Sequence, residues 1–234
     1  MKKIIILFAI LFTSIGFAQG KNIHIEYGLV IQNEPELYKT NALLRSSFEN
    51  AMRDSHKMTF ELIITKDGSK FFDKKKLETD INYGSNSFAL AISSYSGVVY
   101  ELKDRLFVQH PILGQNVYEE SDLKSNWVLT NETKLIDNYL CYKATNIYKV
   151  TNDIKTFLHP VIAWYCPQIP YRYGPNGYSN LPGLILELQV RNVVFGAKVI
   201  KLDSELDFDL KFLDKIKILR GKEVDDAYEK FNGF

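Results

Sequence analysis

Apolar and polar residues alternate with a period of two along most of the chain, which is the pattern of half-buried strands. Residues 21–31 predict a first strand, because almost all odd-numbered residues in this range are apolar. Residues 58–72 predict a hairpin, in which Asp67-Gly68 supplies the positive φ that a tight turn requires. Further strands are expected at residues 88–93, 98–109 (broken near Lys103-Asp104), 126–150 (with turns near Asn131 and at Asp137-Asn138), 157–166, 184–194, 198–202 and 207–213.

Two segments depart from this pattern. Residues 41–55 predict an amphipathic helix, because an apolar stripe recurs there at helical spacing and Thr40 or Asn41 can cap its start. The stripe consists of Leu44, Phe48, Ala51 and Met52. Residues 224–231 predict a short helix at the C-terminus, and the charged segment 73–87 is expected to be a loop.

Because strands follow strands through short links, the sheet is expected to be mostly antiparallel. We predict a mainly β fold, either a curved sheet or a half-open β-barrel. One amphipathic helix (about 40–56) packs on its concave face, and a short helix closes the chain. No linker divides the sequence, so a single domain is expected over residues 19–234.

The N-terminus has the pattern of a secretory signal peptide. Two lysines at residues 2–3 precede an almost unbroken apolar run from Ile4 to Phe17, and the small residues Gly16 and Ala18 occupy the −3 and −1 positions of a cleavage site. The apolar run is shorter than a membrane-spanning helix. We therefore predict that residues 1–18 are removed on export.

Composition and charge narrow the expected partners. The full sequence has 29 basic and 28 acidic residues, and cleavage would remove two lysines and no acid, which leaves a formal net charge of −1. Such a balance gives no basis for binding nucleic acid or an anionic membrane. No cysteine stands directly after the first apolar run and no later run reaches spanning length, so we expect neither a lipid anchor nor a transmembrane segment in the mature chain.

The two cysteines, Cys141 and Cys166, are the natural partners for a disulfide in an oxidising compartment. If residues 139–150 and 157–166 form a symmetric hairpin, the numbers of paired residues sum to 307, and the two cysteines then lie directly opposite each other. A disulfide is feasible there at a non-hydrogen-bonded pair. The alternative is a pair of buried thiols that the sheet brings close together.

The stretch from Gly174 to Leu188 contains two turn signatures. Residues 174–177 form one turn, and residues 181–184 have the composition of a type II turn, since proline presets φ at its second position and glycine supplies the positive φ of its third. A phosphate-binding loop is the alternative, but the required glycine spacing and the following helix are missing. The residues to which we assign a structural turn role are Gly174, Pro175, Leu181, Pro182 and Gly183.

Three tyrosines crowd this double turn beside a charged residue. They are Tyr171, Tyr173 and Tyr178, and the charged residue is Arg172. Aromatic side chains next to a charged donor are frequent in recognition surfaces, and they can equally cover the end of a barrel. If the chain has a binding site, these four residues are the candidates.

Two motifs carry a resemblance to a known family. The stretch "AWYCPQIPYRYGPNGYSNLPGLILEL" resembles the GLPGLI family of secreted proteins from Bacteroidetes, and "WVLTNETKLIDNYLCYKAT" is similar to the same family's upstream pattern. The sequence departs from that pattern at Asn180, Cys166 and Asn192. The resemblance implies a periplasmic or outer-surface location in a Gram-negative cell, and it implies no activity.

No residue pattern indicates an enzyme. The histidines at positions 24, 56, 110 and 159 lack the spacing of HExxH or of a ligand pair, and no GxSxG motif is present. The alternating acids at positions 203, 205, 207 and 209 allow two interpretations, a calcium site or a solvated strand edge, and we favour the edge. We therefore predict no catalytic residue, no cofactor and no metal.

These observations favour a non-enzymatic exported binding protein that holds an apolar ligand or a client segment in its half-barrel. The plan is similar to the half-open barrels of periplasmic lipoprotein carriers, an analogy of fold alone. The alternative is an accessory interaction protein for an outer-membrane receptor or assembly, which would use the tyrosine-rich turn or a free sheet edge. A hollow concave face would favour a ligand carrier, and a filled one the interaction protein.

Overall fold

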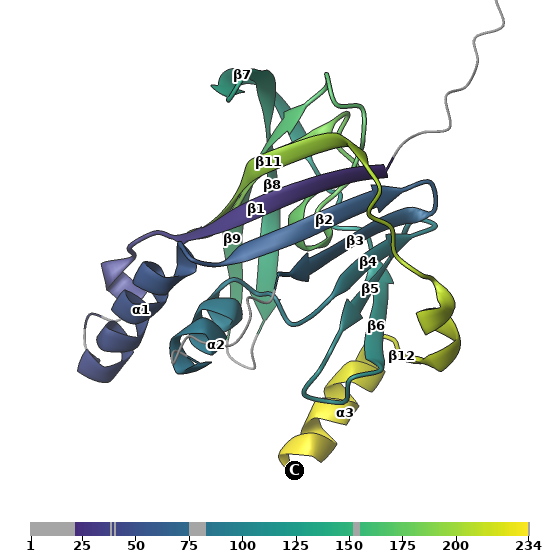
Figure 1. The fold of residues 1–234 in the computed structure, drawn as a ribbon. Coiled ribbons are helices and arrows are strands. Elements are labelled where there is room, and N and C mark those ends of the chain that lie inside the picture. Colours follow the sequence, from purple (N-terminus) through teal and green to yellow (C-terminus); the bar gives the residue numbers. More distant parts are fainter. Residues whose placement is uncertain (1–21, 38, 40, 75–82, 152–154, 234) are drawn as a thin grey trace, which may run out of the picture.

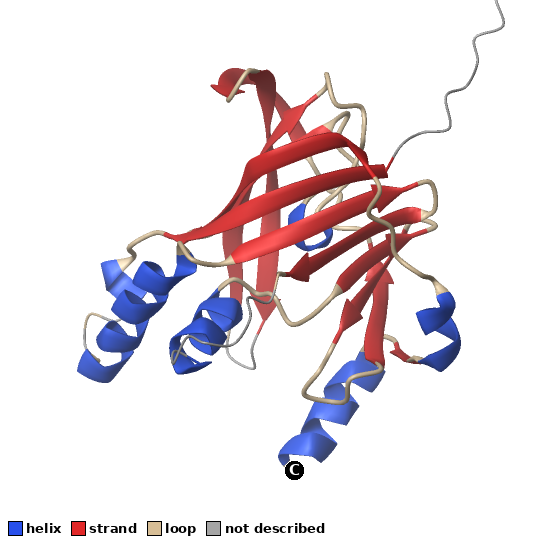
Figure 2. Cartoon of the chain, in the orientation of Figure 1, coloured by secondary structure: helices blue, strands red, loops and turns tan. Residues whose placement is uncertain are grey.

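The computed structural model describes residues 22–37, 39, 41–74, 83–151 and 155–233. The predicted signal peptide, residues 1–18, lies outside the described residues, as do residues 75–82 of the predicted loop 73–87. Figure 1 gives the labels used below, and Figure 2 shows how strands dominate the chain.

Twelve described strands form one sheet, in the order β12-β6-β5-β4-β3-β2-β1-β11-β10-β9-β8-β7. The strands are β1 (Asn22–Ile31), β2 (Thr59–Thr65), β3 (Gly68–Asp73), β4 (Val99–Leu102), β5 (Arg105–Gln109), β6 (Val117–Asp122), β7 (Val128–Ile136), β8 (Tyr139–Thr151), β9 (Thr156–Cys166), β10 (Leu184–Val190), β11 (Val193–Ser204) and β12 (Lys217–Leu219). Neighbours are antiparallel except β12 and β6, which are parallel. The edge strands β12 and β7 do not pair with each other, so the sheet stays open, as predicted.

The sheet is strongly curved. In Figure 1, β1, β2 and β11 run across the view, whereas β8 and β9 stand steeply behind them. The main core lies on the inner face, where alternate side chains of β1 and β2 point. Its centre is aromatic: the Phe60 ring stacks on Phe71 at 5.4 Å between centroids and meets Phe195 edge-on at 5.2 Å. The buried Tyr27 hydroxyl donates to the Ile185 carbonyl at 2.6 Å, which ties β1 to β10.

Helix α1 (Ala42–Ser55) confirms the predicted amphipathic helix. Asn41 caps it, because its side chain accepts a hydrogen bond from the Leu44 backbone N–H at 3.0 Å. Phe48 is buried and meets Phe88 of a second helix edge-on at 5.4 Å. Figure 1 shows the two helices side by side at one end of β1 and β2, so α1 covers that end of the sheet and not the middle of its concave face.

The second helix, α2 (Tyr83–Ile92), corrects the predicted strand at 88–93 and the end of the predicted loop 73–87. Residues 88–92 are consecutive apolar residues, and a short apolar run has no period that separates a strand from a buried helix. Alanine and leucine are strong helix formers, and Ala89 is fully buried within the core. Tertiary packing of α2 on α1 therefore decides the structure of this segment.

Strand β6 (Val117–Asp122) was not predicted, because most of its side chains are polar and it lacks an apolar alternation. It pairs with β5 over five residues, from Arg105 opposite Asp122 to Gln109 opposite Tyr118. The one buried side chain of β6 is that of Tyr118, which is 6% exposed. Backbone pairing along β5 and a single aromatic anchor are thus enough to form the strand.

The predicted strand 207–213 is wrong. This segment forms an irregular stretch and a 3₁₀ helix, η3 (Lys211–Lys215). Its alternating apolar residues cover a second core on the outer face of the sheet, where Phe212 stacks on Tyr100 at 4.1 Å between centroids. The four alternating acids at positions 203, 205, 207 and 209 are exposed, and they do not lie on one strand. Asp207 and Asp209 belong to the irregular stretch, where they accept hydrogen bonds from nearby backbone N–H groups.

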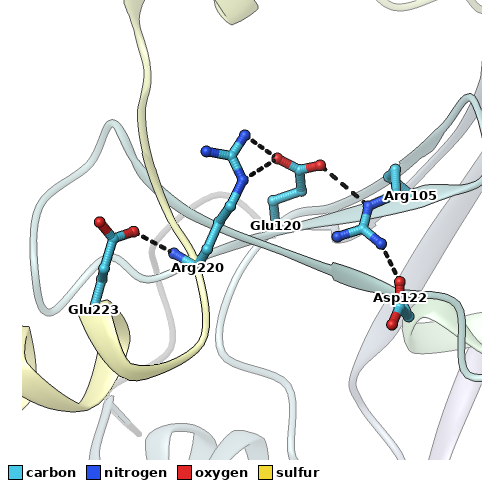
Figure 3. A network of polar contacts seen from close by, with 5 residues as sticks. All are labelled: Arg105, Glu120, Asp122, Arg220 and Glu223. Atoms are coloured by element: carbon cyan, nitrogen blue, oxygen red, sulfur yellow. Dashed lines mark hydrogen bonds and ion pairs between the residues drawn. The ribbon is translucent and has the colours of Figure 1, made fainter.

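Ion pairs fix the C-terminal helix α3 (Lys222–Asn232) to the sheet (Figure 3). The Arg220 guanidinium donates from Nε and Nη2 to Glu120 Oε2 of β6 at 2.8 and 2.5 Å. Arg105 of β5 donates to the other oxygen of Glu120 at 3.1 Å and also pairs with Asp122. Glu223 in the first turn of α3 accepts a hydrogen bond from the Arg220 backbone N–H. The network joins β5, β6 and the start of α3, and α3 confirms the predicted closing helix.

The β7–β8–β9 region follows the predicted register. Pairs from Tyr142 opposite Tyr165 to Thr151 opposite Thr156 all sum to 307. The turn at Asp137-Asn138 is present, with φ of 49° at Asp137. The turn expected near Asn131 is instead a bulge inside β7, because the register shifts between Leu129 and Thr133 without ending the strand.

Candidate functional site

The segment between β9 and β10 enters the concavity of the sheet and fills part of it. Its short 3₁₀ helix η2 (Pro175–Gly177) is fully buried. Gly177 lies so close to Leu106 of β5 that a Cβ atom would come within 2.9 Å of it, and φ at Gly177 is +76°. The Asn176 side chain donates to the Ser94 carbonyl, and the Trp127 indole donates to the Ser179 carbonyl at 2.7 Å. The concave face is thus occupied here by the chain's own residues.

The second turn differs in type from the prediction. Gly183 donates its backbone N–H to the Leu181 carbonyl at 2.8 Å, whereas Leu184 donates to Ile169. The hydrogen bond of a type II turn, from Leu184 to Leu181, is therefore replaced by a three-residue turn centred on Pro182. Gly183 has φ of +151°, and a Cβ atom there would lie 2.2 Å from the Cys166 carbonyl oxygen. Only glycine fits this close approach of the two backbones.

The four residues predicted as binding candidates lie along this segment in different surroundings. Tyr178 is 4% exposed and packs against Trp127 at 6.0 Å between centroids. Tyr171 and Tyr173 are half-buried and pack on the main core. The Arg172 guanidinium remains partly exposed and lies 5.9 Å from the Tyr173 ring. The structure therefore brings Arg172 and Tyr173 together and places Tyr178 inside the fold.

A buried carboxyl group lies beside Arg172. Glu101 of β4 is 3% exposed, and its Oε1 is 3.7 Å from Arg172 Nη2, while Arg172 also pairs with Asp104 in the β4–β5 turn. The Ser179 hydroxyl lies nearby without a hydrogen bond of normal geometry. Burial raises the pKa of Glu101 to about 7, and the influences of Ser179 and Arg172 lower it less than burial raises it. The group that anchors Arg172 thus takes up a proton near neutral pH.

The two cysteines occupy neighbouring buried positions. The β8–β9 ladder begins at Tyr142 and Tyr165, and extending its register by one pair places Cys141 opposite Cys166. Both thiols are free in this structure, and both residues are completely buried. Burial, and then the neighbouring Cys166, raise the pKa of Cys141 to about 12. The predicted disulfide therefore stays a prediction, on a register that the structure confirms.

The inner face of β7, β8 and β9 carries apolar side chains, of which the leucines are exposed, Tyr142 is half-buried and Tyr165 is buried. We call this the β7–β9 apolar surface, and it consists of Leu129, Leu135, Leu140, Tyr142 and Tyr165. In the register, Leu135 lies opposite Leu140, and Tyr142 lies opposite Tyr165. Leu135 is 69% and Leu129 is 54% exposed. An inner face that is covered elsewhere in the sheet is therefore open at this end.

A shallow hollow of about 340 Å³ lies within this surface. It is lined by Leu140, Tyr142, Tyr165, Pro167 and Gln168. The rings of Tyr142 and Tyr165 form one wall, with centroids 6.1 Å apart. The hollow sits where the chain leaves β9 and turns into the concavity, so the filled part of the half-barrel borders it directly.

Strand β7 is also an edge strand of the sheet. It pairs with β8 along one backbone edge, and no described strand pairs with it along the other. Its charged side chains lie on the outer face and are paired: Lys134 donates to Glu187 at 2.7 Å, and Lys143 of β8 donates to Glu132 at 2.9 Å. Among the described residues, the outer backbone edge of β7 therefore has no strand partner, and it borders an apolar inner face.

One group of possible metal ligands occurs in the part of the chain that the structure describes. Atoms of His24, Glu26 and Glu61 lie within 4.8 Å of one another, on the outer face of β1 and β2. The remaining histidines lack such a group: His110 bonds to Tyr228 and Glu119, and His159 stacks on Phe157. Within the described ranges, no helix is long and apolar enough to span a bilayer.

Comparison with known proteins gives one family match. Residues 153–187 match the model of a family described as "Protein of unknown function (Porph_ging)". The match covers 35 of the 234 residues, includes all of β9 and ends in the middle of β10. It therefore includes the segment that fills the concavity. No curated protein matches the sequence.

The fold is similar to that of PNGF-II. Two solved structures of PNGF-II, in space groups P21 and C2, match with TM-scores of 0.53 and 0.51 at 16% sequence identity. The matches cover 90% and 89% of this chain, but only 34% and 33% of the PNGF-II chain. The likeness at this identity concerns the fold, and the chain spans about a third of the length of PNGF-II.

Sequence reasoning found the turn motif and the cysteine register but missed the β7–β9 apolar surface and the ligand group. Leu135 and Leu140 alternate with polar residues as core residues do, and nothing in the alternation says that the sheet ends beside them. The ligand group joins β1 to β2, so Glu61 lies 35 residues from Glu26 in the chain. The one available sequence signal for this group was that His24 and Glu26 lie two residues apart in a predicted strand, so that their side chains share a face.

Proposed function

We propose that this chain is a non-enzymatic, exported binding protein that holds an extended apolar segment of a partner protein on the β7–β9 apolar surface. The observation that carries the proposal is the position of β7. Its outer backbone edge has no strand partner among the described residues, and Leu129 and Leu135 project from the same strand. An added strand would pair with β7 through main-chain hydrogen bonds and lay alternate side chains on the apolar face.

The partly filled concavity supports an extended peptide segment, in preference to an enclosed small ligand, as the bound species. Residues 174–179 are buried where a ligand chamber would lie, and the hollow of about 340 Å³ is open to one side. An extended peptide needs only one apolar side chain in such a hollow and gains the rest of its contacts along the edge. The predicted signal peptide and the resemblance to the secreted GLPGLI family support a periplasmic or outer-surface location.

The test is photo-crosslinking in cells from a photoreactive amino acid placed at Leu135. Leu43 on α1 is the matched control, because it is an 82% exposed leucine far along the chain from β7. We expect adducts from position 135 that map to extended apolar segments of exported proteins, and only background from position 43. The additional substitution Leu129→Asp should remove the adducts without unfolding the protein, since the Leu129 side chain is largely exposed.

The pattern of adducts also separates the two functional classes. Many client segments would indicate a carrier of exported proteins, whereas one outer-membrane protein would indicate an accessory subunit of a receptor or assembly. Equal adduct yields at positions 135 and 43, or adducts that survive Leu129→Asp unchanged, would rule out the β7–β9 apolar surface as the binding site.

A further inference from the structure

Three potential metal ligands converge on the outer face of the sheet, away from the proposed binding surface. His24 and Glu26 are two residues apart on β1, so both point to the same face, and Glu61 lies directly opposite Glu26 on β2. The neighbouring residues Ile23 and Ile25 point into the main core. The three side chains therefore share the opposite face, with ligand atoms within 4.8 Å of one another.

His24 is buried without a partner. It is 3% exposed, and neither ring nitrogen makes a hydrogen bond with any described residue. Nε2 lies 3.7 Å from Glu61 Oε1, a contact that is too long for a hydrogen bond. A buried imidazole with both nitrogens unsatisfied is costly, and such a group calls for a partner that the described chain does not provide.

The two carboxylates already hold a cation. Glu26 and Glu61 face each other across the ladder, an arrangement that repels unless a positive charge lies between them. The Lys74 ammonium takes that position, with Nζ 2.9 Å from Glu26 Oε1 and 2.8 Å from Glu61 Oε1. The ammonium satisfies the carboxylates but leaves His24 unbonded. A cation that accepts nitrogen and oxygen ligands would satisfy all three.

We propose that His24, Glu26 and Glu61 form a binding site for a divalent first-row transition cation, of which Zn²⁺ is the representative. One imidazole and two carboxylates suit Zn²⁺, whereas Ca²⁺ and Mg²⁺ prefer oxygen ligands alone. Tetrahedral ligands at Zn–N and Zn–O distances of 2.0–2.2 Å lie about 3.4 Å apart. The ligand atoms lie within 4.8 Å of one another, so side-chain rotations have to bring them closer by at most about 1.4 Å.

Lys74 controls entry to the site. Its side chain is 44% exposed, more than that of Glu26 or Glu61, so the ammonium can swing into solvent when a metal ion replaces it. The three protein ligands would leave a fourth position for water on the side that Lys74 vacates. Metal binding thus exchanges one cation for another without changing the strands.

The test is Zn²⁺ binding to the purified chain by isothermal titration calorimetry, with Ca²⁺ as the contrast. We expect one Zn²⁺ per chain and no Ca²⁺ binding. Lys74→Gln should raise the Zn²⁺ affinity by about tenfold or more, because it removes the competing ammonium. His24→Gln should lower the affinity by more than about tenfold, the loss that follows even from removing an outer-shell partner.

Two controls keep the test decisive. His110→Gln removes the other buried histidine that contacts a carboxylate, Glu119, and it should leave Zn²⁺ binding unchanged. If His24→Gln does not fold, Glu26→Gln replaces it, because the Glu26 side chain is 23% exposed and tolerates substitution. The near-ultraviolet absorption spectrum of the Co²⁺-loaded protein should lack thiolate-to-cobalt charge-transfer bands, which would exclude Cys141 and Cys166 as ligands.

Absence of Zn²⁺ binding in both the natural chain and Lys74→Gln would overturn the proposal. So would binding that persists in His24→Gln or Glu26→Gln, binding that is lost in His110→Gln, or a preference for Ca²⁺. None of these outcomes depends on the β7–β9 apolar surface, so they leave the proposed function untouched.

Discussion

Gly183 shows at the scale of one residue why the proline–glycine turn has its sequence. Its backbone passes the Cys166 carbonyl so closely that no side chain fits, and its φ lies in a region that other residues rarely adopt. The turn thereby sends the chain from the concavity back into β10. The residue serves the geometry of the fold, as the structural interpretation of the motif predicts.

The substitution Gly183→Ala is expected to lower the free energy of unfolding by at least about 2 kcal/mol, because the new methyl group clashes with backbone that cannot move and φ becomes strained. Gly196→Ala is the matched control. Gly196 lies in β11 with no atom near its Cβ direction, and the change should stay within about 0.5 kcal/mol. Urea unfolding of both variants measures the difference, and equal stabilities would contradict this explanation of the motif.

Glu101 gives a pH dependence. Burial raises its pKa from the ordinary 4.5 to about 7, so the folded protein binds a proton more tightly than the unfolded chain does. The contribution of this group to stability is therefore greatest at low pH, and the free energy of unfolding should decrease as the pH rises from about 4.5 to 7.

Glu101→Gln should flatten this pH dependence, since the amide does not ionise. The exposed Glu36 on the surface provides the control, because Glu36→Gln should keep the slope of the natural protein. Urea unfolding at several pH values between 4.5 and 8 measures both variants. A slope that is unchanged in Glu101→Gln would show that this carboxyl group does not take up the proton.

At the scale of elements, the hairpin of β8 and β9 could be predicted from sequence because a short turn fixes its register. Pairing that sums to 307 follows from the position of the turn alone. Helix α2 could not be predicted in the same way, because residues 88–92 lack a period and only contact with Phe48 selects the helix. The predicted strand at 207–213 was wrong for a related reason. The apolar residues Phe208 and Phe212 pack on the Tyr100 ring, and this segment does not join the sheet.

The same hairpin carries the disulfide prediction. If Cys141 and Cys166 are oxidised in the exported protein, the bond closes a loop of about 25 residues and should stabilise the chain by about 3.5 kcal/mol in the chain-entropy model. The buried thiol of Cys141, with a pKa raised to about 12, should resist alkylation in the folded reduced protein. The bond is therefore expected to form before the strands close.

Non-reducing peptide mapping of the exported chain checks this prediction, with a linked pair of cysteine peptides as the expected result. The double variant Cys141→Ser, Cys166→Ser is the control, because it cannot form the bond and its peptides should remain unlinked. Two free thiols in protein taken from an oxidising compartment would contradict the disulfide.

At the scale of the whole molecule, the open sheet has two different edges. β12 is a three-residue edge strand, tied to β6 and followed by α3, whose start is held by the ion pairs of Figure 3. β7 is longer, contains the exposed Leu129 and Leu135, and lies close to the hollow. The residues around η2 fill part of the concavity between the edges. These features together support β7 and its inner face as the proposed binding site.

The sequence could predict the open, mainly β plan, because alternation and short links determine it. It could not predict which end of the sheet stays uncovered. That depends on where the β9–β10 segment turns inward, and its burial comes from distant partners such as Leu106 and Trp127. The exposed inner face at β7 is a consequence of this packing. The sequence around Leu135 contains no local pattern that predicts it.

Hydrogen exchange tests the binding role of β7 most directly. The measurement compares the free protein with the protein bound to a synthetic peptide of the segment that crosslinks at position 135. We predict that amides in Val128–Ile136 exchange at least about tenfold more slowly in the bound protein, because an added strand pairs with them, while Lys217–Leu219 at the opposite edge is unchanged. Protection at 217–219, or unchanged exchange throughout β7, would contradict the account.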